Sequence, residues 1–394
     1  MPLPLAPRMS RIQASPTAAA MARAAAAKAA GRDVISLTTG EPDFDTPAHI
    51  QEAAIAAMRA GETRYTAVDG TPALKEAIIG KFARENGLNF TPDQVIASTG
   101  AKQVIFNAIL ATISEGDEVI VPSPAWVSYP DIVKLAGGTP VDLPCGPETG
   151  FKPTAEAIAA AITPRTRALM LNSPCNPTGA VLSGDDLRAI GDLLSGRPEI
   201  LVISDDIYEH IRYEAAPFAT FAGACPGLAD QVLTVNGVSK AYAMTGWRLG
   251  YGAGPAPLIR AMRVLQSQST TNPNAIAQAA AAAALNGPFD CVEAQRAAFE
   301  TRRDRLLSAL GNCPGLTLHK PDGAFYLFIG IENALGGRYA TEADFVDALL
   351  ETEDLAVVGG AGFGASPYIR LSFAASDTAL EAAAERLHRF CAAL

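Results

Sequence analysis

The stretch Val235-Asn-Gly-Val-Ser-Lys-Ala-Tyr-Ala-Met-Thr-Gly-Trp-Arg-Leu-Gly250 indicates both the fold and the place of its chemistry. It follows the short, apolar and β-branched run at residues 231–235, which predicts a buried strand. Lys240 comes soon after that strand, and Arg248 follows in the same segment. Because open α/β sheets bind ligands at the carboxyl ends of their strands, both cations are expected at a binding edge.

The neighbours of Lys240 leave room for a bulky ligand, since they are small or hydroxylated: Gly237, Ser239, Ala241, Thr245 and Gly246. Arg248 can hold a phosphate through two parallel hydrogen bonds. A desolvated lysine beside another cation has a lowered pKa and can form a Schiff base with an aldehyde. An aldehyde-reactive lysine beside a phosphate anchor suggests pyridoxal phosphate as the cofactor.

Composition bounds the class of protein. With 394 residues, of which 49% are hydrophobic, the chain is long enough for two domains. The net charge of −10 and the lack of a dense Lys/Arg cluster predict no nucleic-acid partner. No apolar run approaches the roughly 20 residues of a membrane span, so no membrane is expected either. The six cysteines show neither C-x-x-C nor metal-ligand spacing, which favours a reducing, cytoplasmic compartment without a zinc site.

The N-terminal region allows two interpretations. Residues 1–32 contain arginine and lysine but no acidic residue, a composition that faintly resembles a transit peptide. The alternative is an arm over residues 1–14, followed by an alanine-rich surface helix. We favour the arm and helix.

Apolar strands alternate with helical segments along most of the chain, which predicts a largely parallel sheet covered on both faces. The expected strands are at residues 33–37, 95–98, 118–121, 167–171 and 200–203, near Val232 and near Leu249. The expected helices cover residues 47–59, 72–86, 126–135 and 183–194, with another opening at Gly100.

The C-terminal part is patterned differently. A long helical stretch over residues 257–310, interrupted only at 286–288, precedes short strands at 316–318, 324–329, 356–358 and 369–373. Helices near Ala343 and Leu380 alternate with these strands. This pattern predicts a smaller α+β domain.

Five motifs, taken together, resemble those of the pyridoxal-phosphate aminotransferases of fold type I, class I, and of their bacterial aspartate and prephenate aminotransferase subgroup. The motifs, in family order, are Gly40-Glu-Pro-Asp-Phe, Ser173-Pro-Cys-Asn-Pro-Thr-Gly, Ser204-Asp-Asp-Ile-Tyr, Ser239-Lys-Ala-Tyr-Ala-Met-Thr-Gly-Trp-Arg and Tyr368-Ile-Arg-Leu-Ser-Phe. The resemblance runs from about Ser10 to the end. It implies a large cofactor-binding α/β domain at residues 46–289, with a mostly parallel, seven-stranded type of sheet, and a discontinuous small α+β domain at 15–45 and 290–394.

Asp205 follows an apolar strand, so its carboxylate emerges at the same sheet edge as Lys240 and can pair with a ring nitrogen, as the cofactor's chemistry requires. Asp206 stands where the family usually has glutamate, and no role is assigned to it. The resemblance implies that Tyr208 and Asn176 hydrogen-bond the cofactor's phenolic oxygen, which favours the phenolate.

Gly100-Ala101-Lys102 opens a helix directly after a strand, where free backbone N–H groups can bind a phosphate together with Ser239 and Arg248. The resemblance implies that Trp126 stacks on the cofactor ring. It also implies that Tyr65 reaches the phosphate in a neighbouring subunit, which makes the active enzyme a homodimer.

Arg370 lies within an otherwise apolar strand, where a charge requires an anionic partner. In the family this arginine binds the substrate α-carboxylate, assisted by Asn176 and the backbone at Gly40.

A second substrate carboxylate requires another cation. The resemblance assigns this task to Lys102, helped by Ser15 and Thr17; an ordinary solvated lysine is the alternative. Gln13 replaces a lysine that is frequent in the subgroup, and a polar residue there bears on accepting prephenate. Aspartate with 2-oxoglutarate is the first choice of substrates, and prephenate or aromatic substrates remain open.

The implied reaction is a ping-pong transfer in which the freed amine of Lys240 moves the Cα proton as general base and acid. A related lyase or decarboxylase would share Lys240 and Asp205, but would less readily keep Asn176, Arg370 and Lys102. A cofactor-binding regulatory protein would carry a basic DNA-binding module ahead of this region.

Overall fold

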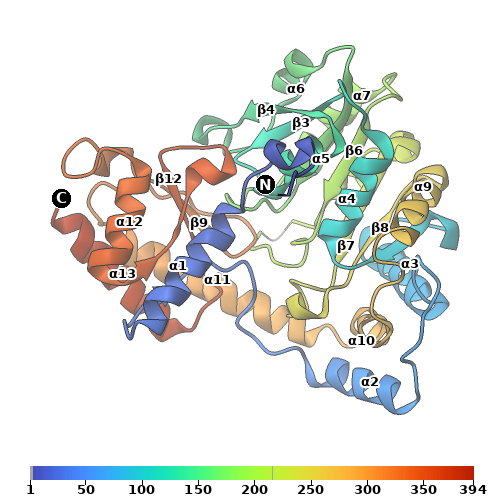
Figure 1. Cartoon of the computed structure of the whole chain (residues 1–394), viewed down its shortest axis with the longest axis horizontal. Coiled ribbons are helices and arrows are strands. Elements are labelled where there is room, and N and C mark those ends of the chain that lie inside the picture. Colours follow the sequence, from blue (N-terminus) through green and yellow to red (C-terminus); the bar gives the residue numbers. More distant parts are fainter. Residues whose placement is uncertain (1–2, 215) are drawn as a thin grey trace.

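A seven-stranded sheet forms the centre of the computed structural model, which describes residues 3–214 and 216–394 (Figure 1). The strand order is β2-β8-β7-β6-β5-β3-β4. Strand β8 is antiparallel to both of its neighbours, and all other pairs are parallel. The strands are β2 (Val95–Ser98), β3 (Glu118–Ser123), β4 (Thr139–Pro144), β5 (Thr166–Asn172), β6 (Leu201–Asp205), β7 (Val232–Gly237) and β8 (Gly250–Ala253). The prediction of a mostly parallel sheet is confirmed.

Alternate residues of the central strands pack on opposite faces of the sheet. On β5, Ala168 and Met170 pack beneath α4 (Ala101–Thr112), α5 (Ser128–Ala136) and α9 (Ala256–Ser267). Leu169 and Leu171 pack beneath α6 (Ala155–Ala161), α7 (Gly184–Leu194) and α8 (Phe221–Ala224). Both faces are therefore covered, which explains why these strands are apolar throughout.

A third apolar core lies at the β2 end of the sheet, beneath α2 (Ala48–Arg59), α3 (Pro72–Asn86) and α10 (Ala275–Asn286). Helix α3 begins as predicted, with the Thr71 hydroxyl accepting a hydrogen bond from the Leu74 N–H at 3.3 Å. Gly87, in the left-handed region, ends it.

Two features of the central sheet and its helices differ from the sequence prediction. Strand β4 was not predicted, because its two prolines and an aspartate interrupt any strand pattern; an edge position in the sheet tolerates them. The helical stretch over 257–286 is also not continuous. It breaks between α9 and α10, where Thr271 is left-handed and Pro273 follows. Helix α11 (Asp290–Leu310) then follows the predicted interruption.

The C-terminal elements form a second, smaller group. Strands β11 (Val358–Gly359), β12 (Tyr368–Ser372) and β9 (Tyr326–Gly330) form an antiparallel sheet in that order, while β1 (Ile35–Ser36) pairs with β10 (Leu355–Ala356). Helices α12 (Glu342–Glu353) and α13 (Asp377–Ala392) pack with them and with α11 around one core. The predicted strand at 316–318 is reduced to a single bridge between Thr317 and Gly330.

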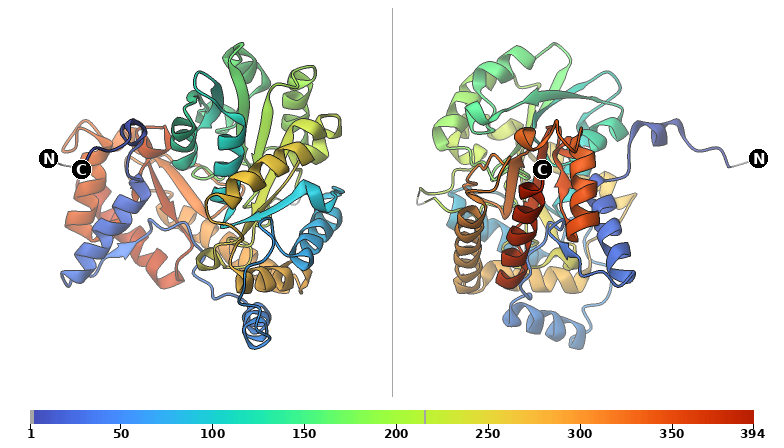
Figure 2. Two further views of the ribbon diagram at one scale, coloured as in Figure 1. Left: turned by 45° about the vertical axis from the view of Figure 1, so that its right-hand side comes forward. Right: turned by 90° about the vertical axis from the view of Figure 1, so that its left-hand side faces the viewer.

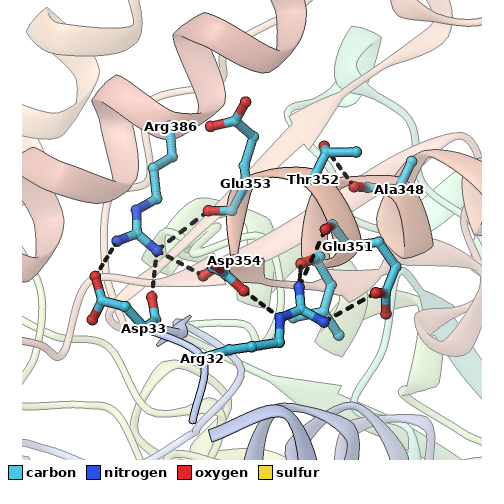
Figure 3. Close-up of polar contacts among 9 residues, drawn as sticks. Arg32, Asp33, Ala348, Glu351, Thr352, Glu353, Asp354 and Arg386 are labelled. Carbon is cyan, nitrogen blue, oxygen red and sulfur yellow. Dashed lines mark hydrogen bonds and ion pairs between the residues drawn. The ribbon is translucent and has the colours of Figure 1, made fainter. Parts of the chain in front are cut away.

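Helix α1 (Pro16–Ala29) lies beside these C-terminal elements, although it is far from them in sequence (Figure 2). Ion pairs hold the segment that follows it (Figure 3). Arg32 Nε lies 2.6 Å from Asp354 Oδ1, and Arg386 Nη2 lies 2.6 Å from Asp33 Oδ2. The chain that leads from α1 toward Gly40 is thereby fixed against the C-terminal end of α12 and against Arg386 within α13.

Within the described residues, no helix is both long and apolar enough to cross a membrane.

Candidate active site

A cavity of about 410 Å³ opens where the carboxyl ends of the parallel strands meet the C-terminal group. Its size is typical of small-molecule sites. It brings together most of the residues that the sequence singled out: Ser15, Thr17, Gly40, Ala101, Lys102, Trp126, Asn176, Asp205, Tyr208, Ser239, Lys240, Arg248 and Arg370.

Lys240 follows β7, and its ammonium donates a hydrogen bond to the Gly40 carbonyl. The Nζ atom also lies 5.7 Å from the centre of the Tyr208 ring. Burial, with the positive charges of Arg370 and Arg248, lowers the pKa of Lys240 to about 8. A larger share of its amine is therefore neutral, and so nucleophilic, than in an ordinary lysine.

Asp205 ends β6 and is buried. Its Oδ2 atom accepts a hydrogen bond from the Tyr129 hydroxyl at 2.6 Å, and its Oδ1 atom accepts one from the Ile207 N–H at 3.3 Å. Burial raises the pKa of Asp205 to about 6. A cationic partner in the cavity would stabilise the carboxylate, so this group suits a protonated ring nitrogen.

Arg370 lies on β12 and is 2% exposed. Its Nη1 donates to Asn176 Oδ1 at 3.0 Å and its Nη2 to the Thr38 carbonyl at 2.8 Å. No carboxylate pairs with Arg370 among residues 3–214 and 216–394, and its Nε has no hydrogen-bond partner there. A buried cation with neutral partners is suited to binding an anion.

The Gly40 carbonyl accepts a hydrogen bond from Lys240, whereas the Thr38 carbonyl accepts one from Arg370. The sequence indicated the backbone near Gly40 but did not indicate Thr38.

Arg248 lies against the first turn of α4, because glycines at this contact allow close packing. A Cβ atom added to Gly100, whose φ is 86°, would lie 2.7 Å from Arg248 Nη2. One added to Gly250 would lie 2.1 Å from the Ala101 nitrogen. The two glycines therefore allow the Arg248 guanidinium to lie beside the free N–H groups at the start of α4. This arrangement binds phosphate.

Lys102 stands over Trp126, with Nζ 4.7 Å from the ring centre. Burial, and then the charge of Arg248, lower the pKa of Lys102. Ser15 and Thr17, at the start of α1, line the same cavity, and the Ser15 hydroxyl accepts a hydrogen bond from the Ala18 N–H at 3.4 Å. Ser15 therefore also caps a helix.

Tyr65 is not brought to this cavity. It is 90% exposed and lies beside a separate hollow with Arg64 and Asn272. It does not line the cavity that the other candidate residues share.

Two tyrosines in the cavity wall, Tyr129 and Tyr326, were missed. Tyr326 Oη lies 2.8 Å from Tyr208 Oη, and Tyr129 is the hydrogen-bond donor to Asp205. Tyr326 occurs in an apolar strand and Tyr129 in a predicted helix, where a tyrosine is typical of ordinary core, so the sequence carries no signal of these hydroxyl contacts.

Pyridoxal phosphate fits this set of residues. Lys240 can hold its aldehyde carbon, the raised pKa of Asp205 suits its ring nitrogen, and the glycine-lined turn beside Arg248 suits its phosphate.

Comparison with known proteins agrees with this geometry. The sequence model of the family described as "Aminotransferase class I and II" matches residues 32–387. The chain is 52% identical to an aspartate/prephenate aminotransferase of Cereibacter sphaeroides over 99% of each chain, and 50% identical to an aspartate aminotransferase of Rhizobium meliloti over 98% of this chain and 96% of that one.

Solved structures also match over nearly the whole chain. The crystal structure of the aspartate aminotransferase from Rhizobium meliloti has a TM-score of 0.96 at 49% identity, covering 99% of both chains. That of Thermus thermophilus with maleate has a TM-score of 0.94 at 43% identity, covering 98% of this chain and 100% of that one. The predicted fold type I is confirmed. The chain therefore belongs to the class I and II aminotransferases, enzymes that use pyridoxal phosphate to move an amino group between an amino acid and a 2-oxo acid.

Proposed function

We propose that this aminotransferase uses aspartate as its amino donor and 2-oxoglutarate as its acceptor. The observation that carries the proposal is that two cations without acidic partners, Arg370 and Lys102, line one cavity in the described part of the chain. Both substrates are dicarboxylates, so each cation receives one carboxylate. The related enzyme of Rhizobium meliloti is named aspartate aminotransferase, and that of Thermus thermophilus was solved with maleate, itself a dicarboxylate.

The proposed roles follow the chemistry of each side chain. Arg370 and Asn176 hold the α-carboxylate near Gly40, while Lys102, Ser15 and Thr17 hold the second carboxylate. Asp205 pairs with the cofactor's ring nitrogen, Tyr208 and Asn176 hydrogen-bond its phenolic oxygen, and Trp126 stacks on its ring. Its phosphate is bound by Gly100, Ala101, Ser239 and Arg248, with Lys102 at the same turn.

When bound, the cofactor supplies an electron sink that acidifies the substrate Cα–H bond. Arg370 fixes one end of the substrate, which aims this bond at Lys240. Once the substrate amine has displaced it from the cofactor, the neutral amine of Lys240 would take the proton from Cα as base and deliver it to the cofactor's aldehyde-derived carbon as acid. The cavity walls formed by the buried Tyr208 and the partly buried Trp126 limit the access of water.

The active unit is a homodimer in this proposal, with Tyr65 of each chain reaching the phosphate of its partner. The 90% exposure of this aromatic side chain supports a contact outside its own chain. We also place the enzyme in the cytoplasm and divide the chain into an arm (1–14), a small domain (15–45 and 290–394) and a large domain (46–289). The core shared by Leu37 and α11–α13 supports this division.

A second candidate substrate is prephenate or an aromatic amino acid. A further hollow of about 450 Å³ adjoins the cavity at Lys102 and Ser15, and its lining includes apolar side chains such as Ile12 and Phe106 as well as polar ones such as Gln13. It has room for a ring. The related enzyme of Cereibacter sphaeroides is named aspartate/prephenate aminotransferase.

Single-turnover absorbance measurements of the holoenzyme with aspartate, glutamate, alanine, phenylalanine and arogenate test the proposal. Aspartate and glutamate are expected to react fastest. Replacing Lys102 by Ala removes one charged hydrogen bond, which is worth about 1.5–3 kcal/mol, so the rates with acidic substrates should fall roughly 10- to 100-fold while alanine is unaffected. Acidic substrates that react no faster than alanine, or that ignore the Lys102→Ala change, contradict the proposal.

A further inference from the structure

Tyr326 contacts residues at several parts of the site. It begins β9, is fully buried and lines the cavity. Its hydroxyl lies 2.8 Å from that of Tyr208, and its ring centre lies 4.4 Å from Arg370 Cζ. The sequence indicated only a strand at this position.

The sheet register explains why Tyr326 meets Arg370. Tyr326 pairs with Ser372 across β9 and β12, while Arg370 pairs with Phe328. Tyr326 and Arg370 are therefore diagonal neighbours on one face, a separation that aromatic and long side chains bridge. The ring of Phe363 lies 4.8 Å from the same guanidinium, so two aromatic rings fix its position.

The hydroxyl of Tyr326 also packs against Gly40, whose carbonyl accepts the hydrogen bond from Lys240. A Cβ atom added to Gly40 would lie 2.8 Å from Tyr326 Oη but 3.8 Å from the ring carbon that bears it. The hydroxyl, and not the ring, therefore requires glycine at position 40. The carbonyl of this glycine is the acceptor for Lys240.

We propose that Tyr326 is a positioning residue that couples the cofactor's phenolic-oxygen contact at Tyr208 to the carboxylate contact at Arg370. The inference rests on the proposed roles of those two residues. Either hydroxyl can donate in the bond between Tyr208 and Tyr326; when Tyr326 donates, the Tyr208 proton is left to point into the cavity, since each hydroxyl has one proton. The ring of Tyr326 holds the guanidinium of Arg370 in a fixed plane. One side chain thus sets two contacts that lie on different elements.

The test follows the cofactor's absorbance in the substrate-free holoenzyme as the pH is varied, and the measured quantity is the midpoint of this titration. Tyr326→Phe keeps the ring and removes the hydroxyl. This loss weakens the hydrogen bond that Tyr208 donates to the cofactor's phenolic oxygen. Because that donation favours the phenolate, the midpoint of the titration should rise by roughly 0.5–1 pH unit, the effect of one neutral hydrogen bond. Michaelis constants for aspartate and alanine should change less than about threefold, because the cation–π contact is kept.

Tyr326→Leu removes the ring as well. Its Michaelis constants for both amino acids should rise roughly 2- to 30-fold above those of Tyr326→Phe, the value of one cation–π contact. The matched control is Tyr213→Phe, which removes another largely buried hydroxyl of the same core; this hydroxyl donates to the Ala324 carbonyl and does not line the cavity. The control should leave the titration midpoint unchanged.

Equal midpoints in Tyr326→Phe and Tyr213→Phe overturn the inference. The variant Tyr208→Phe distinguishes a failure of this inference from a failure of the proposed function. If Tyr208→Phe moves the midpoint and Tyr326→Phe does not, only the coupling fails; if neither moves it, the role of Tyr208 fails and the coupling with it.

A second pair of variants covers the case in which a Tyr326 variant binds the cofactor poorly. Gly40→Ala should weaken cofactor binding, because the new methyl group meets the Tyr326 hydroxyl. Adding Tyr326→Phe removes the clash and should restore binding to the level of Tyr326→Phe alone. A double variant that binds as poorly as Gly40→Ala shows that the hydroxyl does not set this contact and overturns that part of the inference.

Discussion

At the scale of single residues, the environment of Lys240 converts a common side chain into a nucleophile. Burial and two arginines lower its pKa to about 8, and the Gly40 carbonyl orients it. Lys240→Ala should abolish covalent attachment of the cofactor, measured by mass spectrometry after borohydride reduction. Lys134→Ala, at a half-exposed lysine on α5, is the control and should retain attachment. Normal attachment in Lys240→Ala would contradict the assignment.

Single residues also differ in whether their role in this site can be predicted from the sequence. Lys240, Asp205 and Arg370 were predicted because each is a charge at the end of, or within, an apolar strand, which is costly without a function. Tyr129 and Tyr326 carry no such cost. A buried tyrosine is common in a core, and only the spatial position of its hydroxyl reveals its partner.

At the scale of elements, the packing of β8 on the start of α4 forms the phosphate end of the site. Gly250→Ala would place a methyl group 2.1 Å from the Ala101 nitrogen, so strand and helix must separate. We expect the dissociation constant of the cofactor to rise at least about tenfold, as expected when one charged contact is lost. Gly246→Ala, in the same segment with nothing within 4 Å of its added Cβ, is the matched control. Equal affinities in the two variants, measured by equilibrium dialysis, would contradict this role.

A buried ion cluster connects α3 to the segment that follows Asp205. Lys81, fully buried on α3, pairs with Glu209, and the Asn86 amide donates to Glu209 Oε2 at 2.9 Å. Lys81→Met leaves the carboxylate without its cation and should lower the free energy of unfolding by about 3–5 kcal/mol. Lys134→Met, at a partly exposed pair with Asp131, should cost less than about 1 kcal/mol. Urea unfolding of both variants checks the difference.

The pH dependence of this cluster has a definite sign. Burial alone would raise the pKa of Glu209, but Lys81 and His210 together lower it to about 2. Because the folded pKa lies below the unfolded value, the unfolded chain binds more protons in acid. The contribution of Glu209 is therefore complete above about pH 4.5 and is lost as the pH falls toward 2. In Lys81→Met this part of the acid dependence should shrink, because only His210 and Asn86 then remain to lower the pKa of Glu209.

At the scale of the whole molecule, the alternation of strands and helices was enough to predict the central sheet and the second group of elements. The boundaries that failed are those where local pattern and tertiary position disagree. Strand β4 is held in the sheet by β3 despite its prolines, and residues 316–318 form a single bridge, between Thr317 and Gly330. Neither outcome is encoded locally, because both depend on which neighbour a segment meets.

The exposed position of Tyr65 leads to a prediction about the assembled enzyme. If each active site takes Tyr65 from the partner, a dimer of one Tyr65→Ala chain and one Lys240→Ala chain contains one intact site, because the chain with Lys240 receives its tyrosine from the other. Refolding an equal mixture should yield about a quarter of wild-type activity per chain, since half of the dimers are mixed and each has one working site of two. Either variant refolded alone provides the baseline. Activity no higher than the mean of these baselines would show that each chain completes its site with its own residues.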